Sequence, residues 1–322
     1  TGYQNIIIGH RAGETATGLQ NAVIIGKNAG ALINTNAEGV VAIGKDSAKN
    51  ATGGKFSVSV GMTSLFGNVT GQYNTAIGQS SMQGASGQSH SNNTAVGYQS
   101  LYAVTTGSSN TIVGVNAGDA ITTGAGNVAL GRNALTALNT GTSNVAIGND
   151  SLSALTGTVV GITAIGYDSL KSLTSGASNT AVGYEAGKSI TTASSNTLVG
   201  YQCGDAINTG SSNSAFGKSA LTANTSGIRN TAIGETSMQS NTTGGYNVSV
   251  GRESLYRNQT GSQNTAVGHS ALSGVSSNSH SNNTAVGFSA LAGCTTGGYN
   301  TALGKDAGDS VTSGEKNVFV GT

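Results

Sequence analysis

A short segment recurs along the whole chain and constrains its fold more than any other feature. Asn74–Gly78 reads Asn-Thr-Ala-Ile-Gly, and close copies stand at Asn93–Gly97 and Asn264–Gly268. With the closing glycine as an anchor, the segment occurs nineteen times, at positions 9, 26, 44, 61, 78, 97, 114, 131, 148, 166, 183, 200, 217, 234, 251, 268, 287, 304 and 321. Fourteen of the eighteen intervals are 17 residues, two are 18 and two are 19. The repeat therefore decides the architecture.

Aligning the copies on the anchor gives columns of constant character. The residue before the anchor is bulky and apolar in all nineteen copies, and the residue three before it is β-branched in eighteen. The residue between these two is usually Ala, and the residue four before the anchor is Asn in fifteen copies. Three positions after the anchor, every copy has Ala, Ser or Cys. A β-branched run closed by Gly and followed by a polar bend predicts one short strand per repeat.

Seventeen residues are too few for the two helices of a helical repeat. They suit one coil of a solenoid in which each strand pairs in parallel with the strand of the next coil. The sequence therefore predicts an all-β parallel β-solenoid, or β-roll, of about 18 coils with 17 residues each. Length alone would suggest two domains, but the repeat predicts one continuous domain over residues 1–322, which we expect to be part of a longer fibre.

The interior of the coil is predicted from alternation along the strand. The bulky column and the β-branched column share one face, and the Ala and Asn columns share the other. We expect the bulky column to pack inside.

Four positions after the anchor the residue is Leu or Met in eleven copies and Gly in six, and five of the six glycine copies have Ile or Val three positions later (Ile33, Ile121, Ile190, Ile207 and Val311). This indicates two sites that share one packed pocket.

Composition excludes several classes of protein. The chain has 51 Gly, no Pro and 8% charged residues, against roughly 25% charged in an ordinary domain. Fourteen basic and 13 acidic residues give no excess that would attract nucleic acid. No apolar run is long enough to insert into a membrane.

Both faces of the predicted strand are largely uncharged, so one coil interior cannot cover both. A stripe of small apolar side chains along the coils is larger than monomers usually expose. We therefore expect a side-by-side homo-oligomer with closed rotational symmetry, which also has the option of stacking end to end into filaments.

The units Asn93–Tyr102 and Gly244–Gly251 resemble the Asn-Thr-Ala-Val-Gly-Tyr-Gln-Ala-Leu repeats of phage and phage-like tail-fibre proteins. They are similar, more distantly, to the repeats in the heads of trimeric autotransporter adhesins. The resemblance covers essentially the whole chain. The adhesin resemblance implies a trimeric left-handed parallel β-roll on an extracellular fibre. Coils of adhesin heads are typically shorter than 17 residues, which leaves the handedness open.

Two groups of residues are candidates for a surface-binding site. Tyr167, Tyr184 and Tyr201 follow the anchor in three consecutive coils and would form either a platform for a sugar chain or a stabilising ladder. His90 and His280 lie in an identical stretch, Ser89–Gly97 and Ser279–Gly287, inside the two 19-residue coils. This stretch would be either a protruding ligand-binding loop or an ordinary copied surface loop.

No catalytic, cofactor-binding or metal-binding set is predicted. Carboxylates recur after the anchor, at Asp46, Asp119, Asp150, Asp168, Asp205, Asp306 and Asp309, but neighbouring coils seldom both carry one. They are interpreted as solvated turn residues, with a weak Ca²⁺ site around Asp150, Asp168 and Glu185 as the alternative. Cys203 and Cys294 lie five coils apart, too far to form a disulfide within one chain.

These observations predict a non-enzymatic, extracellular fibre segment on a virion tail or a cell surface. Its partners would be further copies of the chain and a cell-surface glycan or receptor. The alternative is an ice- or glycan-binding solenoid that uses either a ladder of Thr residues, which fill the β-branched column in ten copies, or the Tyr ladder. This Thr column shares its strand face with the bulky apolar column, which argues that the Thr side chains are buried. A polysaccharide-cleaving enzyme ranks third, because no acid–base cluster is evident.

Overall fold

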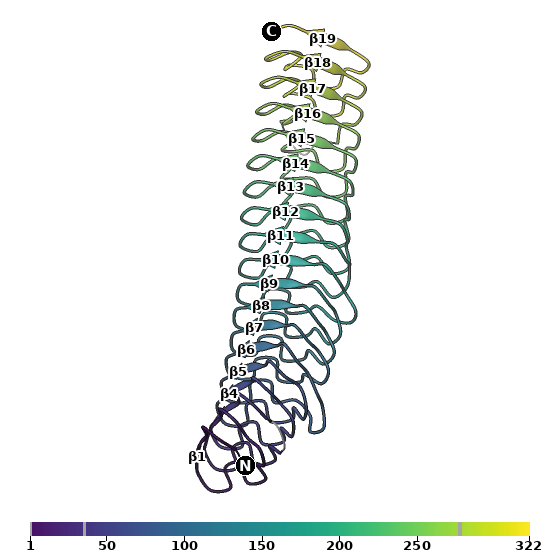
Figure 1. Cartoon of the computed structure of the whole chain (residues 1–322). Coiled ribbons are helices and arrows are strands. Elements are labelled where there is room, and N and C mark those ends of the chain that lie inside the picture. The colour runs from purple at the N-terminus through teal and green to yellow at the C-terminus, as the bar shows by residue number, and fades with distance from the viewer. Residues whose placement is uncertain (1, 35–36, 276–278) are drawn as a thin grey trace. The chain divides into compact units, whose positions relative to one another are not determined.

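The chain forms an all-β parallel solenoid of nineteen short strands in about 18 turns, as the repeat predicts. The computed structural model describes residues 2–34, 37–275 and 279–322. The chain divides into two compact units, residues 1–162 and 163–322. In each unit one three-residue strand per turn is followed by a series of tight bends (Figure 1).

Unit 1 contains nine strands and unit 2 contains ten. In unit 1 they are β1 (Ile6–Ile8), β2 (Val23–Ile25), β3 (Val41–Ile43), β4 (Val58–Val60), β5 (Thr75–Ile77), β6 (Thr94–Val96), β7 (Thr111–Val113), β8 (Val128–Leu130) and β9 (Val145–Ile147). In unit 2 they are β10 (Thr163–Ile165), β11 (Thr180–Val182), β12 (Thr197–Val199), β13 (Ser214–Phe216), β14 (Thr231–Ile233), β15 (Val248–Val250), β16 (Thr265–Val267), β17 (Thr284–Val286), β18 (Thr301–Leu303) and β19 (Val318–Val320).

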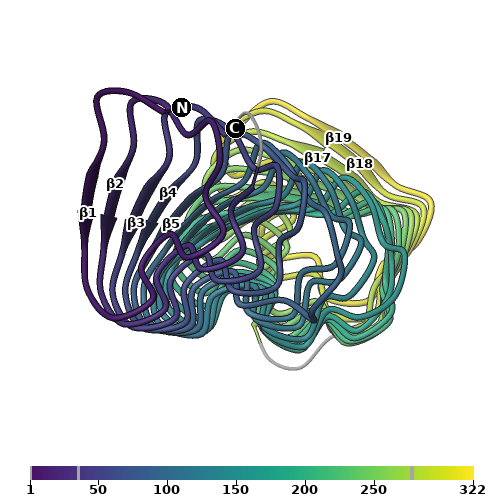
Figure 2. The same cartoon turned by 60° about the horizontal axis from the view of Figure 1, so that its bottom comes forward.

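Each strand pairs in parallel with the next strand of its unit, column on column. In β6 and β7, for example, Thr94 pairs with Thr111 and Val96 pairs with Val113. Figure 2 shows successive turns within a unit lying over one another. The backbone groups of the bends also pair between turns, as where Leu101 N donates to Ala117 O at 3.0 Å. The repeat period is therefore the length of one turn.

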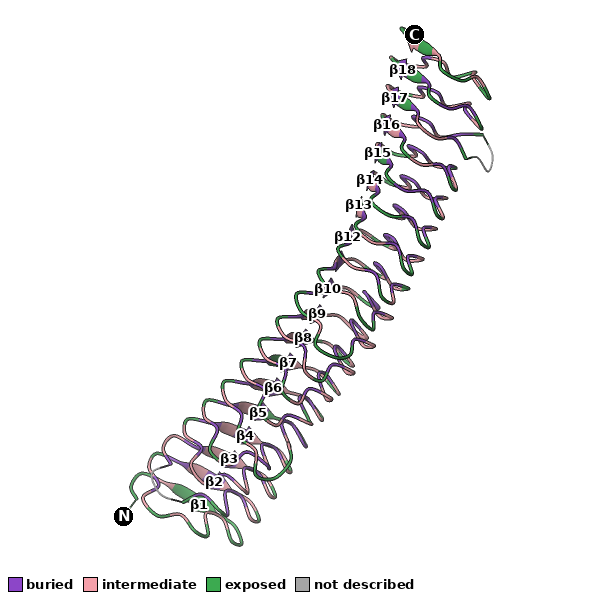
Figure 3. Cartoon of the chain, turned by 90° about the vertical axis from the view of Figure 1, so that its right-hand side faces the viewer, coloured by how far each residue is buried: buried purple, intermediate pink, exposed green. Residues whose placement is uncertain are grey.

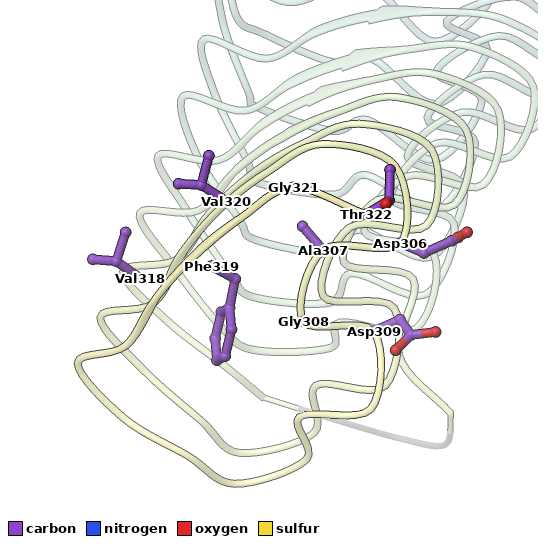
Figure 4. A pocket seen from close by; sticks show the side chains of 9 residues that line it. All are labelled: Asp306, Ala307, Gly308, Asp309, Val318, Phe319, Val320, Gly321 and Thr322. Atoms are coloured by element: carbon purple, nitrogen blue, oxygen red, sulfur yellow. The ribbon is translucent and has the colours of Figure 1, made fainter.

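The interior lies on the opposite face of the strand from the one we expected. The middle residue of the strand is buried in seventeen of the nineteen strands, while the β-branched and bulky residues on either side of it are half-buried or exposed (Figure 3). Leu130 and Phe216 of the bulky column are 47% and 40% exposed. Figure 4 shows the alternation in β19, where Val318 and Val320 point away from the turn and Phe319 points into it. The expectation that the bulky column packs inside is wrong.

The narrow interior explains this orientation. Strand residues such as Ala95 fill one side of it, and bend residues such as Ser100 and Leu101 fill the other, all with no exposed surface. In turns whose strand carries Ala, the large buried side chains come from the bend, as with Leu135 and Leu138. The small residues three after the anchor lie inside, as the alignment implies.

The predicted volume compensation is present and involves a third position. A Cβ on Gly118 would lie 3.0 Å from Ile121 Cδ1 and 3.3 Å from Ile112 Cδ1. A Cβ on Gly204 would similarly lie 2.8 Å from Ile207 and 2.9 Å from Leu198. Where Leu or Met fills this place instead, the strand carries Ala or Ser at its middle position, as Ala95 does beside Leu101. The middle strand residue therefore shares the pocket with the two bend positions.

An asparagine ladder runs through the interior beside the strands. Asn93 Oδ1 accepts hydrogen bonds from Asn110 N at 3.0 Å and from Asn110 Nδ2 at 3.1 Å. Asn110 Nδ2 also donates to Gly124 O at 2.9 Å. The ladder comprises Asn74, Asn93, Asn110, Asn127 and Asn144 in unit 1 and Asn179, Asn196, Asn213, Asn230, Asn247, Asn264, Asn283, Asn300 and Asn317 in unit 2. Losing one amide would leave a backbone N–H unpaired, at a cost of about 1–3 kcal/mol.

The anchor glycines are required by how closely consecutive turns approach. Their φ angles lie between 122° and 144°, a region that side chains rarely adopt. A Cβ on Gly26 would lie 2.6 Å from the carbonyl oxygen of Gly44, and one on Gly234 would lie 2.6 Å from that of Gly251. No larger residue fits at this bend without separating the turns.

The shared pocket predicts a coupled pair of substitutions. Ile112→Ala should destabilise the protein by about 2–5 kcal/mol, because it leaves a cavity in a buried site. Adding Gly118→Leu should recover part of this loss. Leu135 occupies the equivalent position in the next turn with a φ of 61°, and the middle residue of the strand before it is Ala129. Urea unfolding followed by circular dichroism would measure both variants.

Gly118→Leu alone is the control for this pair. It should destabilise the intact pocket by about 1–3 kcal/mol through overpacking. A sum of the two single effects that equals the effect of the double variant would mean that the two positions do not share space.

Candidate surface site

Tyr167, Tyr184 and Tyr201 form an exposed ladder on unit 2. Each follows an anchor glycine in consecutive turns, and the three side chains are 44%, 42% and 48% exposed. The ring centroids of Tyr167 and Tyr184 are 5.3 Å apart with planes at 11°, and those of Tyr184 and Tyr201 are 5.1 Å apart with planes at 7°. The in-register repeat thus converts three separate residues into one aromatic strip.

The rings overlap only in part. Carbon atoms in full contact lie about 3.5–4.0 Å apart, so rings with centroids at 5.1–5.3 Å are not in full face-to-face contact. Each ring therefore keeps an edge and part of a face open to solvent. The sugar platform and the stabilising ladder are therefore compatible interpretations. Stacking holds the rings in place and still leaves an exposed aromatic surface for a ligand.

A ladder of polar side chains runs next to the tyrosines. Lys188 Nζ lies 2.7 Å from Glu185 Oε1 and 3.5 Å from Asp168 Oδ2. Lys171 Nζ lies 3.0 Å from Asp168 Oδ1, and Gln202 Nε2 donates to Glu185 Oε2 at 2.8 Å. The lysine side chains are 38% and 39% exposed, whereas those of Asp168 and Glu185 are 4% and 14% exposed, so the network presents mainly its donors to solvent.

The tyrosine and polar ladders influence each other electrostatically. The negative charge of Glu185 is the main cause of a raised pKa at the Tyr184 hydroxyl. The hydrogen bond from Lys188 is in turn the main cause of a lowered pKa at the Glu185 carboxyl. A carboxylate that accepts hydrogen bonds therefore stands beside the aromatic strip at neutral pH.

His90 and His280 are not surface residues. Their exposed fractions are 2% and 0%, so the prediction that they belong to a surface-binding loop is wrong. Their backbone oxygens accept hydrogen bonds from Asn74 Nδ2 at 2.7 Å and Asn264 Nδ2 at 2.8 Å. The two extra residues of each 19-residue turn carry the imidazole into the interior, next to the asparagine ladder. Part of the second turn, residues 276–278, lies outside the described residues.

Both imidazoles are poorly satisfied in the interior. Within the described residues, neither ring nitrogen of His90 has a hydrogen-bond partner, and Nε2 of His280 has none. Burial lowers the pKa of each histidine to about 4. Both side chains are therefore neutral at physiological pH, and neither can contact an external ligand.

Within the described residues, each unit also contains a buried serine cluster. A cluster of three mutually bonded hydroxyls, Ser47, Ser59 and Ser64, has a counterpart in Ser237, Ser249 and Ser254. The offset between the clusters is 190 residues, from 237 − 47, and the histidines have the same offset, from 280 − 90. The serine clusters stand where Ser replaces Ala in the strand, and the added hydroxyl is satisfied by its neighbours.

The remaining candidates stay apart. Within the described ranges, no group of three His, Cys, Asp or Glu side chains is arranged to hold a metal ion. Burial raises the pKa of Asp119 and of Asp205. Cys203 and Cys294 are both buried, and burial raises the pKa of Cys203 to about 12.

A hollow of about 580 Å³ lies at the end of unit 2, lined by residues 306–309 and 318–322 (Figure 4). It consists of the interior of the turn that ends in β19. Its walls are Val, Ala, Gly and Phe with two carboxylates, and we regard it as an open turn and not as a ligand site.

The outward face of the strands is uncharged in both units. Its two columns are Thr, Val, Ile or Ser on one side and Ile, Val, Leu or Phe on the other, with no charged residue in any of the nineteen strands. The part of the chain that the structure describes contains no helix long and apolar enough to cross a bilayer.

No known protein family matches the chain, and no curated protein sequence is significantly similar to it. Its function must therefore be argued from the chemistry of these surfaces.

The buried histidines predict a loss of stability in acid. A histidine whose pKa falls from 6.5 to about 4 on folding stabilises the protein fully above pH 6.5 and loses that contribution between pH 6.5 and 4. The loss amounts to about 3 kcal/mol per histidine. Melting temperatures measured from pH 7 to pH 4 should therefore fall more steeply for the natural protein than for a His90→Leu, His280→Leu double variant.

His10→Leu is the matched control, because His10 is exposed. This variant should follow the natural protein across the whole range. Parallel curves for all three proteins would show that the buried imidazoles do not titrate on unfolding.

Proposed function

We propose that the chain is a structural and adhesive segment of an extracellular fibre, in which three copies pack side by side. The observation that carries this proposal is the uncharged outward sheet face. Exposed apolar side chains such as Ile77 (39%), Leu130 (47%) and Phe216 (40%) repeat along it. A continuous apolar stripe of this kind is typical of a surface that another protein covers.

The coil architecture suits a mechanical role. Each turn is joined to its neighbours by strand pairing, by bend hydrogen bonds and by the asparagine ladder. Such stacking satisfies the backbone without a large globular core. The resemblance to tail-fibre repeats supports the same role, and we propose on this basis that the fibre belongs to a virion tail or a cell surface.

Native mass spectrometry tests the proposed assembly. We expect a species of three times the 31.6 kDa chain mass. A Val182→Lys, Val199→Lys double variant should be a monomer, because the face would then bury two charges that have no partner. Both residues lie on the outward face of unit 2.

Thr192→Lys is the control for this variant, since Thr192 is an exposed bend residue of the same turn as Val182. It should leave the trimer intact. A natural protein that is stable and soluble as a monomer at micromolar concentration would overturn the proposed fibre assembly.

Ice binding is the second candidate, and one observation favours it. The Thr column occurs in ten of the nineteen strands and lies on the outward face, so the burial that argued against this function is absent within a single chain. Thr occupies three consecutive strands in β5–β7, in β10–β12 and in β16–β18, on a face without charge. A monomer with thermal hysteresis, abolished by a Thr-to-Val series along the column, would replace the fibre proposal with this one.

A further inference from the structure

We propose that the tyrosine ladder of unit 2 binds a linear, neutral polysaccharide that lies along the direction of coil stacking. The binding residues are Tyr167, Tyr184 and Tyr201, and the half-buried Glu185, Lys188 and Gln202 of the polar ladder supply the hydrogen bonds. The proposal deepens the adhesive role above and rests on it for its biological setting. Its test needs only the chain itself.

The spacing of the rings suits a repeating ligand. Their centroids are 5.3 and 5.1 Å apart, because each ring belongs to one turn of the solenoid. Sugars of an extended β-1,4-linked chain follow one another at nearly the same interval. Partly open ring faces and edges can therefore contact the apolar C–H surfaces of consecutive sugars. Three adjacent contacts add up, whereas one isolated ring offers only a single weak contact.

The polar ladder favours hydroxyl groups and disfavours charged sugars. Glu185 Oε1 and Oε2 already accept from Lys188 and Gln202, which orients both donors beside the rings. The charges of Asp168 and Glu185 cancel those of Lys171 and Lys188, so the patch has no net attraction for an acidic polysaccharide. A neutral glycan satisfies such a mixed set of donors and acceptors best.

The same column elsewhere lacks this arrangement. Tyr98 follows an anchor in unit 1 and is 44% exposed, but its neighbours in the column are Gln79 and Val115. His269 and Phe288 stack at 5.2 Å, which makes only two rungs. Within the described residues, three consecutive aromatic rings in this column occur only at the proposed site. Tyr98 therefore provides a matched control with equal exposure and no ladder.

Isothermal titration of the full chain with soluble cellohexaose and mannohexaose tests the proposal. We expect saturable binding of at least one of the two sugars. Tyr184→Ala should weaken it by at least tenfold, because the central rung is lost. Tyr184→Phe should retain binding, since the ring remains, and Tyr98→Ala should have no effect. Circular dichroism would confirm that each variant is folded.

Several outcomes would overturn the proposal: no saturable binding of either hexaose, equal losses in Tyr184→Ala and Tyr98→Ala, or tighter binding of hexagalacturonate. A change of native mass in Tyr184→Ala, without an effect on sugar binding, would instead identify the ladder as a contact between copies. Glycan binding by a monomeric chain would leave this proposal standing while the fibre assembly failed.

Discussion

The close approach of consecutive turns at the anchor glycine is the constraint on which the whole solenoid depends. Parallel strands lie about 4.8 Å apart, and at this bend the carbonyl of one anchor occupies the space where a Cβ of the preceding anchor would stand. Extra residues are consequently excluded from the strand and its closing glycine. The 18- and 19-residue turns place them in the following bends, where His90 and His280 are found. The strands and the Asn ladder stay in register as a result.

Most of the fold followed from the sequence, but the identity of the interior face did not. The nineteen strands and their parallel pairing agree with the repeat, because a β-branched run closed by Gly has few other solutions. We placed the bulky column inside because larger apolar residues are usually buried. In a coil this narrow, however, a strand followed by a bend Leu carries Ala or Ser, and a strand with a large middle residue such as Ile112 is followed by a bend Gly. The pairing of Ile112 with Gly118, against Ala95 with Leu101, was the signal in the sequence that could have identified the interior face.

The candidate site was predictable only where it depends on the period alone. Tyr167, Tyr184 and Tyr201 occupy one column, so their proximity follows from the alignment. The polar ladder was missed because Lys188 reaches both its own turn and the preceding one, which depends on side-chain conformation. His90 and His280 were predicted to lie at the surface because a turn with extra residues normally indicates a protruding loop. Nothing in the residue types indicates that both imidazoles are instead buried in the interior.

The asparagine ladder has a consequence for how such a chain would respond to force. Each amide bonds only to the turns directly above and below it, so tension applied along the axis within a unit is carried by identical links in series. Rupture at one link releases a single turn and leaves the others intact. Each release would lengthen the molecule by 17 residues of extended chain, on the order of 55–60 Å. The unit would then lengthen in steps of one turn under tension and would not unfold in a single event.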